Sequence, residues 1–394
     1  MTPDIDPALR ETVETLSALD RTPCTEGERR AAEWLAERFR AAGIPDVALE
    51  DEPSWGTFPP TLIALGALGL AGAALTLSGR RAAGFLAAAA SLAGVADEAQ
   101  NGPRLFRRAL RRRRTTVNVV ARAGDPDAER TLVVLAHHDA PQTGLLFDQS
   151  VLKALHARFP SLIEPRKTSP PQWWVGVGAQ LLTIAGALTG RRRLTAGGLA
   201  LGALATAAVV DIARSETVPA ANDNASGVAG LVGAAEVLRA RPIAGLRVLL
   251  VSCGAEETLQ DGIRGFMARH ADELPRGRTW VLNLDTVGSP NLGLLEAEGP
   301  LWMERYTDPT FCDLVAESAD GAGVEMERGL RARSSTDAII PSRAGHPTAC
   351  LVSTELWKGL SNYHLPTDVP ENVDYSTVAD AVRVVDSTAR RLAA

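Results

Sequence analysis

Short apolar runs alternate with helix-like segments along most of the chain, and this alternation predicts an α/β fold. The strand-like runs are residues 116–121, 131–136, 247–252, 279–284 and 348–352. Helical periodicity marks residues 10–43 as a helix pair and recurs at residues 228–239, 263–271, 309–321 and 378–392. Strands that alternate with helices favour a mostly parallel mixed sheet flanked by helices.

Two stretches interrupt this pattern with long apolar runs. Residues 53–79 and 82–96 contain no charged residue, and two arginines separate them. Residues 173–190 and 194–210 repeat the arrangement around three arginines. Each stretch predicts a helical hairpin with arginines at its tip. A run of about 18 apolar residues can cross a bilayer, and the pair Trp173-Trp174 suits a membrane interface. We therefore expect four inserted transmembrane helices in a multi-pass membrane protein.

The alternative is that both hairpins are soluble Ala/Gly-rich elements. They would then pack on each other or on a second subunit of a homo-oligomer. In either case the hairpins divide the α/β domain. The expected division is residues 1–52, 101–167 and 214–394 for the three parts of that domain, with hairpins at 53–100 and 168–213.

Net charge, cysteine spacing and the N-terminal sequence exclude several classes of partner and of structural feature. The formal net charge of −6 gives no overall basic field, which argues against nucleic acid as a partner. The cysteines are widely spaced without a CxxC motif, so neither a zinc finger nor a disulfide framework is predicted. The N-terminus lacks the apolar run of a signal peptide.

Basic residues also bear on orientation. Five arginines lie at the hairpin tips, at Arg80, Arg81 and Arg191 to Arg193. More lie on the other side, at Arg104, Arg107, Arg108, Arg111 to Arg114, Arg166, Lys167 and Arg214. Because cytoplasmic segments carry an excess of Lys and Arg, we expect the α/β domain on the cytoplasmic face. The run from Arg104 to Arg114 is also compatible with contact to lipid headgroups.

Potential metal ligands follow three of the predicted strands. They are His137 after the first, Glu256 and Glu257 after the second, and Asp285 after the third. Ligands of open α/β sheets bind beyond the carboxyl ends of the strands. Asp223, between two asparagines before a predicted helix, and His364 can reach the same crevice from loops. Each residue alone is commonly a turn, core or surface residue, and their joint placement is what favours a site.

Two histidines and three carboxylates, one of them shared, suit a pair of zinc sites that accept water. Because Glu256 and Glu257 are adjacent, one would be a ligand and the other a general base. Asp139 would accept a hydrogen bond from the imidazole of His137 or fix the local geometry.

Five motifs carry a family resemblance. In chain order they are LAHHDA, ANDNASG, GAEE, NLDTVG and NYHLPTD. Together they resemble metallopeptidase family 28, the di-zinc aminopeptidases, and residues 21–44 look like its N-terminal helices. The resemblance covers roughly residues 10–50, 115–140 and 218–394, and it implies a zinc-exopeptidase-like fold.

The resemblance also implies roles for particular residues. His137 and Asp285 would bind one zinc ion, Glu257 and His364 the other, and Asp223 would bridge both. Glu256 would be the general base, and Tyr363 would offer a phenol that stabilises the tetrahedral oxyanion. Asp337, in SSTDAIIP, resembles a Ser-Asp-His segment near the site, with Ala338 in place of the histidine.

The hairpins depart from the family pattern. Family members usually join the ligands equivalent to His137 and Asp223 by a short loop, whereas here 83 residues lie between Asp139 and Asp223. The second hairpin leaves the sheet beside the site, so it would place the cleft at the membrane surface and restrict substrates to membrane-near or lipophilic ones.

The expected function is therefore that of a membrane-associated, zinc-dependent exopeptidase with two zinc ions, which removes N-terminal residues from peptide substrates. One alternative is a glutaminyl-cyclase-like zinc acyltransferase, whose relatives keep one zinc, whereas all five ligands are present here. A non-catalytic membrane scaffold would have lost ligands or the base. A transporter would need ionisable groups in the spans, which offer only isolated polar groups such as Gln180.

Overall fold

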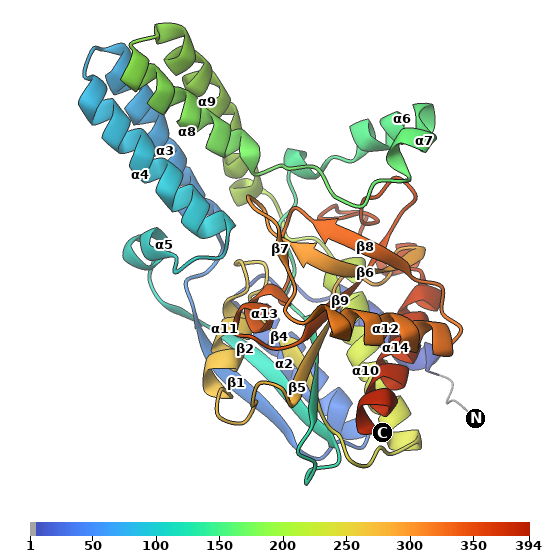
Figure 1. Cartoon of the computed structure of the whole chain (residues 1–394). Coiled ribbons are helices and arrows are strands. Elements are labelled where there is room, and N and C mark those ends of the chain that lie inside the picture. Colours follow the sequence, from blue (N-terminus) through green and yellow to red (C-terminus); the bar gives the residue numbers. More distant parts are fainter. Residues whose placement is uncertain (1–4) are drawn as a thin grey trace.

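The computed structural model describes residues 5–394, and a nine-stranded mixed sheet forms its centre (Figure 1). The strand order is β1-β2-β4-β3-β5-β9-β6-β7, and β8 pairs with β6. The bounds are β1 (Val47–Ser54), β2 (Arg114–Gly124), β3 (Thr131–His137), β4 (Arg247–Cys253), β5 (Thr279–Leu284), β6 (Asn291–Glu298), β7 (Glu304–Arg305), β8 (Glu327–Ala332) and β9 (Thr348–Thr354).

The four central strands β4, β3, β5 and β9 run parallel. Outside them β2 pairs antiparallel with β4, β1 with β2, and β6 with β9. All five predicted strands are present, and the mixed α/β fold is confirmed, but antiparallel pairings on both sides of the parallel centre make the sheet less parallel than expected. The parallel centre matters for function because it brings the carboxyl ends of β3, β4 and β5 to one edge.

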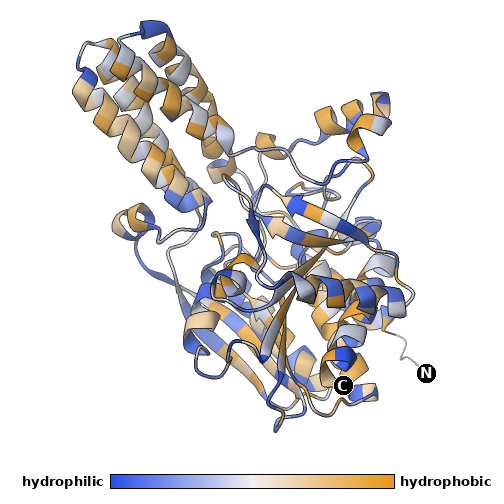
Figure 2. Ribbon diagram, in the orientation of Figure 1, coloured by the Kyte–Doolittle hydropathy of each residue, from blue (hydrophilic) through white to orange (hydrophobic). Residues whose placement is uncertain are grey.

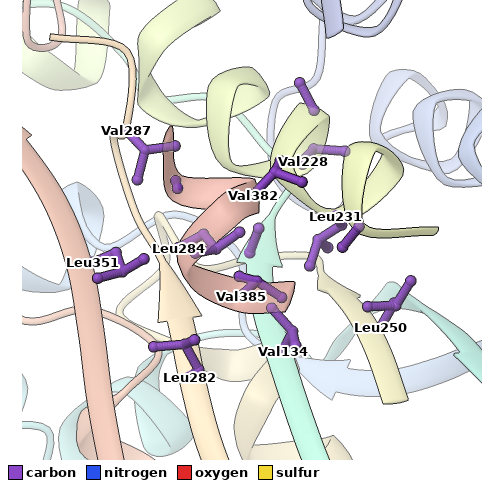
Figure 3. Close-up of a cluster of buried hydrophobic side chains, with 14 of the residues drawn as sticks. Val134, Val228, Leu231, Leu250, Leu282, Leu284, Val287, Leu351, Val382 and Val385 are labelled. Atoms are coloured by element: carbon purple, nitrogen blue, oxygen red, sulfur yellow. The ribbon is translucent and has the colours of Figure 1, made fainter. Parts of the chain in front are cut away.

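Helices cover both faces of the sheet. The larger core joins the sheet to α1 (Asp6–Ser17), α2 (Glu26–Ala41), α10 (Gly227–Ala240), α12 (Pro309–Gly321) and α14 (Tyr375–Ala393). The smaller core lies under α11 (Asp261–Arg269) and α13 (Ile339–Arg343). Strand β3 serves both, because Leu132 and Val134 face the larger core while Val133 and Leu135 face the smaller one. Figure 3 shows part of the larger core, including Leu231 of α10 and Val385 of α14.

The two hairpins pack into one four-helix bundle that projects from the catalytic domain (Figure 1). The helices are α3 (Pro59–Leu77), α4 (Arg81–Ala99), α8 (Trp174–Thr189) and α9 (Arg192–Arg214). Apolar residues dominate along the bundle, and hydrophilic residues gather at its tip (Figure 2). At the tip, Arg81 donates to the carbonyls of Ala187 and Leu188, and Arg192 donates to that of Leu77. The tip arginines therefore hold the two hairpins together.

Among residues 5–394, three helices are long and apolar enough to cross a membrane: α3, α4 and α9. A 19-residue helix rises about 28 Å, close to the thickness of a bilayer core. Helix α8 has 16 residues and is too short by this criterion. The four predicted helices are thus present. Only three of them are long and apolar enough to span a membrane, so the expected count of four spans is not confirmed.

Several short elements near the bundle were not predicted. Helix α5 (Leu105–Leu110) follows α4, while η1 (Leu145–Phe147), α6 (Ser150–Arg158) and α7 (Pro160–Ile163) precede α8. In Figure 1, α6 and α7 lie on the side of the catalytic domain from which the bundle projects. Two further short helical elements are η2 (Ala221–Ser226), before α10, and η3 (Pro370–Asn372), before α14.

Candidate active site

The potential ligands meet at the carboxyl edge of the parallel strands. His137 ends β3, Glu257 follows β4, and Asp285 follows β5 directly, while Asp223 comes from η2 and His364 from the loop after β9. Their ligand atoms form the groups His137–Asp223–Asp285 and Asp223–Glu257–His364, and within each group these atoms lie within 4.8 Å of one another. The structure therefore brings all five predicted ligands together, and Asp223 belongs to both groups.

The spacing within the groups suits a metal better than hydrogen bonds. His364 Nε2 lies 3.2 Å from Asp223 Oδ2 and 3.5 Å from Glu257 Oε1, and His137 Nε2 lies 3.3 Å from Asp223 Oδ1. Neither ring nitrogen of His364 has a hydrogen-bond partner among the described residues, although both are buried. A tetrahedral zinc ion with bonds of about 2.0 Å holds its ligands roughly 3.3 Å apart. The residues present therefore fit zinc.

The charges of the site also call for a cation. Burial raises the pKa values of Glu256 and Glu257 well above the usual range of a carboxyl group, and the repulsion between these two carboxylates adds to the shift at Glu257. Burial also raises the pKa of Asp285 to about 6. For His137 burial alone would lower the pKa, but the neighbouring carboxylates of Asp139, Asp223 and Glu256 raise it well above normal. Buried carboxylates in such excess require a positive charge to remain ionised.

The backbone around Asp223 is held by side chains on every side. The carboxylate of Asp368 accepts the N–H groups of Asn222 (2.8 Å) and Asp223 (3.1 Å). Asn224 donates to the carbonyl of Leu284 (2.9 Å) and thereby ties the turn to the end of β5. The flanking asparagines thus fix the turn rather than the rotamer of Asp223, and α10 begins only at Gly227. Asp368 stands in the motif NYHLPTD, but no role was predicted for it.

Asp139 fixes the loop that carries both glutamates. Its two oxygens accept the backbone N–H groups of Glu256 (3.0 Å) and Glu257 (2.9 Å). The distance from His137 Nδ1 to Asp139 Oδ1 is 3.5 Å, and no hydrogen bond forms there. Of the two roles predicted for Asp139, the structure favours the fixing of local geometry.

Glu256 has a partner that the sequence did not reveal. Gln260 donates a short hydrogen bond from Nε2 to Glu256 Oε1 and a second, of 3.1 Å, to the carbonyl of Ser335. Glu256 also belongs to a group of potential ligand atoms with His137 and Glu257. Its carboxylate is therefore held beside the ligands in one orientation.

Aromatic rings close the site around His364. The ring centroid of Tyr363 lies 3.9 Å from that of His364. The ring centroid of Phe147, a residue of η1, lies 4.3 Å from that of His364. Burial raises the pKa of Tyr363 well above normal, and the charges of Asp223 and Glu257 add to this. Phe147 was not predicted, because no local pattern marks a lone phenylalanine in a polar loop.

Asp337 is buried near the predicted ligands, as the resemblance suggested. Burial raises its pKa to about 7, His137 opposes the shift, and the carboxylates of Asp139 and Asp285 add to it.

A small pocket of about 10 Å³ lies between His364, Glu257 and the base of the bundle. Its lining includes Phe58 and Pro59 at the start of α3 and Ile212 near the end of α9, together with Phe147. Phe58 also contacts Trp173 at the start of α8, with ring centroids 6.5 Å apart. The inserted helices therefore contribute directly to the surroundings of the active site.

Comparison with known proteins agrees with this geometry. The model of Peptidase family M28 matches residues 205–389. This region includes Asp223, Glu256, Glu257, Asp285 and His364, while His137 and Asp139 lie before it. No curated protein sequence matches the chain.

Three solved structures are similar over nearly the whole chain. A leucine aminopeptidase precursor from Bacteroides thetaiotaomicron has a TM-score of 0.56 at 14% identity, over 99% of this chain and 98% of that one. A Zn-dependent exopeptidase from Parabacteroides distasonis has a TM-score of 0.55 at 14% identity, over 98% of both chains. A glutaminyl cyclase from Bacteroides thetaiotaomicron bound to N-acetylhistamine has a TM-score of 0.56 at 14% identity, over 99% of both chains. At these identities the likeness shows the fold.

Proposed function

We propose that this chain, a metallopeptidase of family M28 by its residues 205–389, is a membrane-anchored exopeptidase that uses two zinc ions to remove N-terminal residues from peptides. The observation that carries the proposal is the position of Asp223, which belongs to two groups of ligand atoms at once. A carboxylate shared in this way suits two adjacent metal ions, and Glu256 lies beside His137 and Glu257, where a general base is needed.

His137 and Asp285 would hold one zinc ion, Glu257 and His364 the other, and Asp223 both. Zinc ions bound there would polarise the scissile carbonyl and lower the pKa of a water molecule. All other steps fall to side chains of this chain.

Glu256 would take a proton from the attacking water and pass it to the amine nitrogen as the C–N bond breaks, so the base is regenerated in each cycle. Gln260 keeps the carboxylate of Glu256 oriented, and Asp139 holds the backbone on which Glu256 and Glu257 stand. The phenol of Tyr363 would donate a hydrogen bond to the oxyanion of the tetrahedral intermediate.

The experiment that tests this proposal uses the two adjacent glutamates as a matched pair. The purified wild-type chain should bind two zinc ions and cleave peptides that have a free N-terminus, but not N-blocked ones. Glu256→Gln should keep both zinc ions while kcat falls by about 10²-fold or more. Glu257→Gln should lose zinc as well as activity. Loss of zinc in Glu256→Gln, or peptidase activity retained in it, would contradict the assignment of the base.

The fold similarity to a glutaminyl cyclase keeps a second enzymatic function open. A peptide with N-terminal glutamine distinguishes the two, because a cyclase converts it to pyroglutamyl peptide with loss of ammonia, whereas an aminopeptidase releases free glutamine. Conversion to pyroglutamyl peptide with a single bound zinc would favour the cyclase. No reaction with any peptide would favour a non-catalytic scaffold.

Membrane anchoring is supported by the lengths and composition of α3, α4 and α9. Aromatic residues, among them Phe58, Trp173 and Trp174, stand at the base of the bundle, where a membrane interface would lie. We place the catalytic domain on the cytoplasmic face.

A further inference from the structure

Large hydrophobic side chains are exposed on one side of the molecule. Among the described residues, every such side chain except Leu49 lies on the bundle, on α5, in residues 145–162 or in two loops. The loops carry Trp302 and Leu356. The first contacts the end of α4, because Gln100 donates to the carbonyl of Trp302 (3.0 Å). The exposed apolar surface thus continues from the bundle onto the catalytic domain.

The largest part of this surface outside the bundle is residues 145–163, the surface segment. None of the described residues of α6 is buried. The exposed apolar side chains of the surface segment are Leu145, Leu146, Val151, Leu155, Phe159 and Leu162, with Leu145 80% and Val151 70% exposed. Such a concentration of apolar groups on the surface of a protein domain is unusual and marks an interaction site.

Basic residues accompany the apolar ones. Lys153 and Arg158 lie in α6, and Arg166 follows α7. Two acidic residues lie nearby: Glu164 contacts His156 (2.9 Å), and Asp148 accepts the N–H of Ser150 (2.7 Å). A short helix with exposed leucines and basic groups is typical of elements that lie in a lipid headgroup layer.

The surface segment is connected both to the bundle and to the active site. The N–H of Leu145 donates to Asp211 Oδ2 of α9 (2.6 Å). Two residues later Phe147 packs on the imidazole of His364. The segment therefore begins between α9 and a predicted zinc ligand, and then runs outward.

We infer that the surface segment lies in the headgroup layer of the bilayer, so that the active-site pocket opens at the membrane surface and the substrates are peptides held there. The substrate class rests on the proposed exopeptidase function. The lining of the pocket by Phe58, Pro59 and Ile212 of the bundle supports this position.

A bilayer is the occupant that the surroundings favour. On the other flank of the bundle base, α5 exposes Leu105 (64%) and Leu110 (57%) beside Arg111 to Arg114. Helix α5 lies on one flank of the bundle base and α6 and α7 on the other (Figure 1). Apolar and basic groups thus occur on both flanks of the helices proposed to enter the membrane. A lipid surface contacts both flanks at once and complements their positive charge.

The first test measures depth with fluorescence. A fluorophore attached to Leu155→Cys in nanodiscs should be quenched when brominated lipid replaces ordinary lipid. The control is Ala271→Cys, an exposed site after α11, which should show no quenching. Absence of quenching at both positions would overturn the inference. Shielding of the Leu155→Cys label that depends on protein concentration and not on bromine would also overturn it, because a second copy would then cover the segment.

The second test concerns substrates. One peptide with a free N-terminus is compared with and without a C-terminal acyl chain that holds it on vesicles. The double change Val151→Asp and Leu155→Asp should raise KM for the acylated peptide about tenfold and leave kcat and the soluble peptide unaffected. Equal effects on both peptides, or none, would overturn the proposed substrate class.

These tests separate the two proposals. If the Leu155→Cys label is quenched but wild type hydrolyses neither peptide, the membrane contact stands while the exopeptidase function and its substrates fall. If both peptides are cleaved equally well and no label is quenched, the exopeptidase stands and the membrane-surface site falls.

Discussion

The amide of Gln260 is the contact that orients the proposed base. Because a hydrogen bond to a charged group contributes about 1.5–3 kcal/mol, Gln260→Ala should lower kcat by roughly tenfold to a hundredfold. KM and zinc content should stay within about twofold, since Gln260 contacts no residue of the two groups proposed to hold zinc. The measurement is steady-state kinetics with metal analysis, and the exposed Gln172→Ala serves as the matched control. An unchanged kcat would show that Glu256 is oriented without this amide.

Glu298, the last residue of β6, provides a prediction for pH. Burial raises the pKa of its carboxyl from 4.5 to about 8, although the N–H of Thr336 (3.0 Å) opposes the shift. The folded chain therefore binds a proton that the unfolded chain releases above pH 4.5. Stability should fall as pH rises from about 4.5 to 8 for this reason. Glu298→Gln has no such proton and can still accept from Thr336.

The melting temperature of Glu298→Gln should therefore exceed that of wild type, and the difference should grow from pH 5 to pH 8. At pH 8 the difference should reach at least about 2 °C. Melting curves of both chains across this range provide the measurement. Because effects of pH on zinc binding are common to both, the difference isolates Glu298. Parallel curves would show that the carboxyl is ionised in the folded state.

The residues that carry chemistry could be predicted because each follows an apolar strand or stands in a recognisable motif. His137, Glu257 and Asp285 are examples, and the structure brings them together as expected. The residues that hold them could not be predicted. Gln260 is an ordinary polar residue in sequence, and the partnership of Asp368 with Asp223 spans 145 positions. Such contacts arise only from the tertiary fold.

At the scale of elements, segments of uniform apolar composition were predicted more reliably than segments of mixed composition. The bundle helices were predicted because an uncharged run of such length has few other structures. Strand β6 was missed because glycine and glutamate obscure its apolar positions, as in its sequence NLGLLEAE. Helices α6 and α7 were missed because they bury almost no side chain, so no core-facing period marks them.

Adjacent glycines in α9 give a test of the bundle. A Cβ at Gly198 would lie 2.7 Å from the carbonyl oxygen of Ala179 and 2.4 Å from Oγ1 of Thr183 on α8, whereas one at Gly197 would meet nothing closer than 3.9 Å. Gly198→Ala should therefore destabilise the protein by about 1–3 kcal/mol. Gly197→Ala should be neutral or stabilising, because alanine favours helix over glycine.

Thermal unfolding of both glycine variants in detergent, followed by size-exclusion chromatography, is the measurement. The pair lies on one helix at the same depth, so general effects on insertion cancel. Equal melting temperatures would indicate that α8 and α9 do not pack as closely in the membrane as they do in this structure.

At the scale of the whole molecule, the bundle and the site lie on the same edge of the sheet. Buried ion pairs hold the bundle base to the catalytic domain: Arg104 contacts Asp261 of α11, and Arg107 contacts Glu98 of α4. Arg107 also donates to the carbonyl of Thr258, next to the two site glutamates. Because charges removed from water make such pairs costly to break, the bundle should move with the catalytic domain as one body.

The same contacts refine the prediction of membrane orientation. Arg104 and Arg107 are neutralised by their buried partners, and Arg81 and Arg192 at the tip bind carbonyl groups. The remaining basic residues still favour the catalytic side, where Arg112, Arg113 and Arg114 are exposed. Under the positive-inside rule this side is cytoplasmic.

Cysteine labelling of intact cells with a membrane-impermeant maleimide tests this orientation. Ser78→Cys, exposed at the bundle tip, should react in intact cells, and Ala271→Cys should react only after lysis. The unsubstituted chain gives the background from Cys24, which is half-buried. The reverse pattern would place the active site outside the cytoplasm. If both positions react only after lysis, the bundle does not cross the membrane, and its apolar surface must be covered in another way, such as by a second copy of the chain.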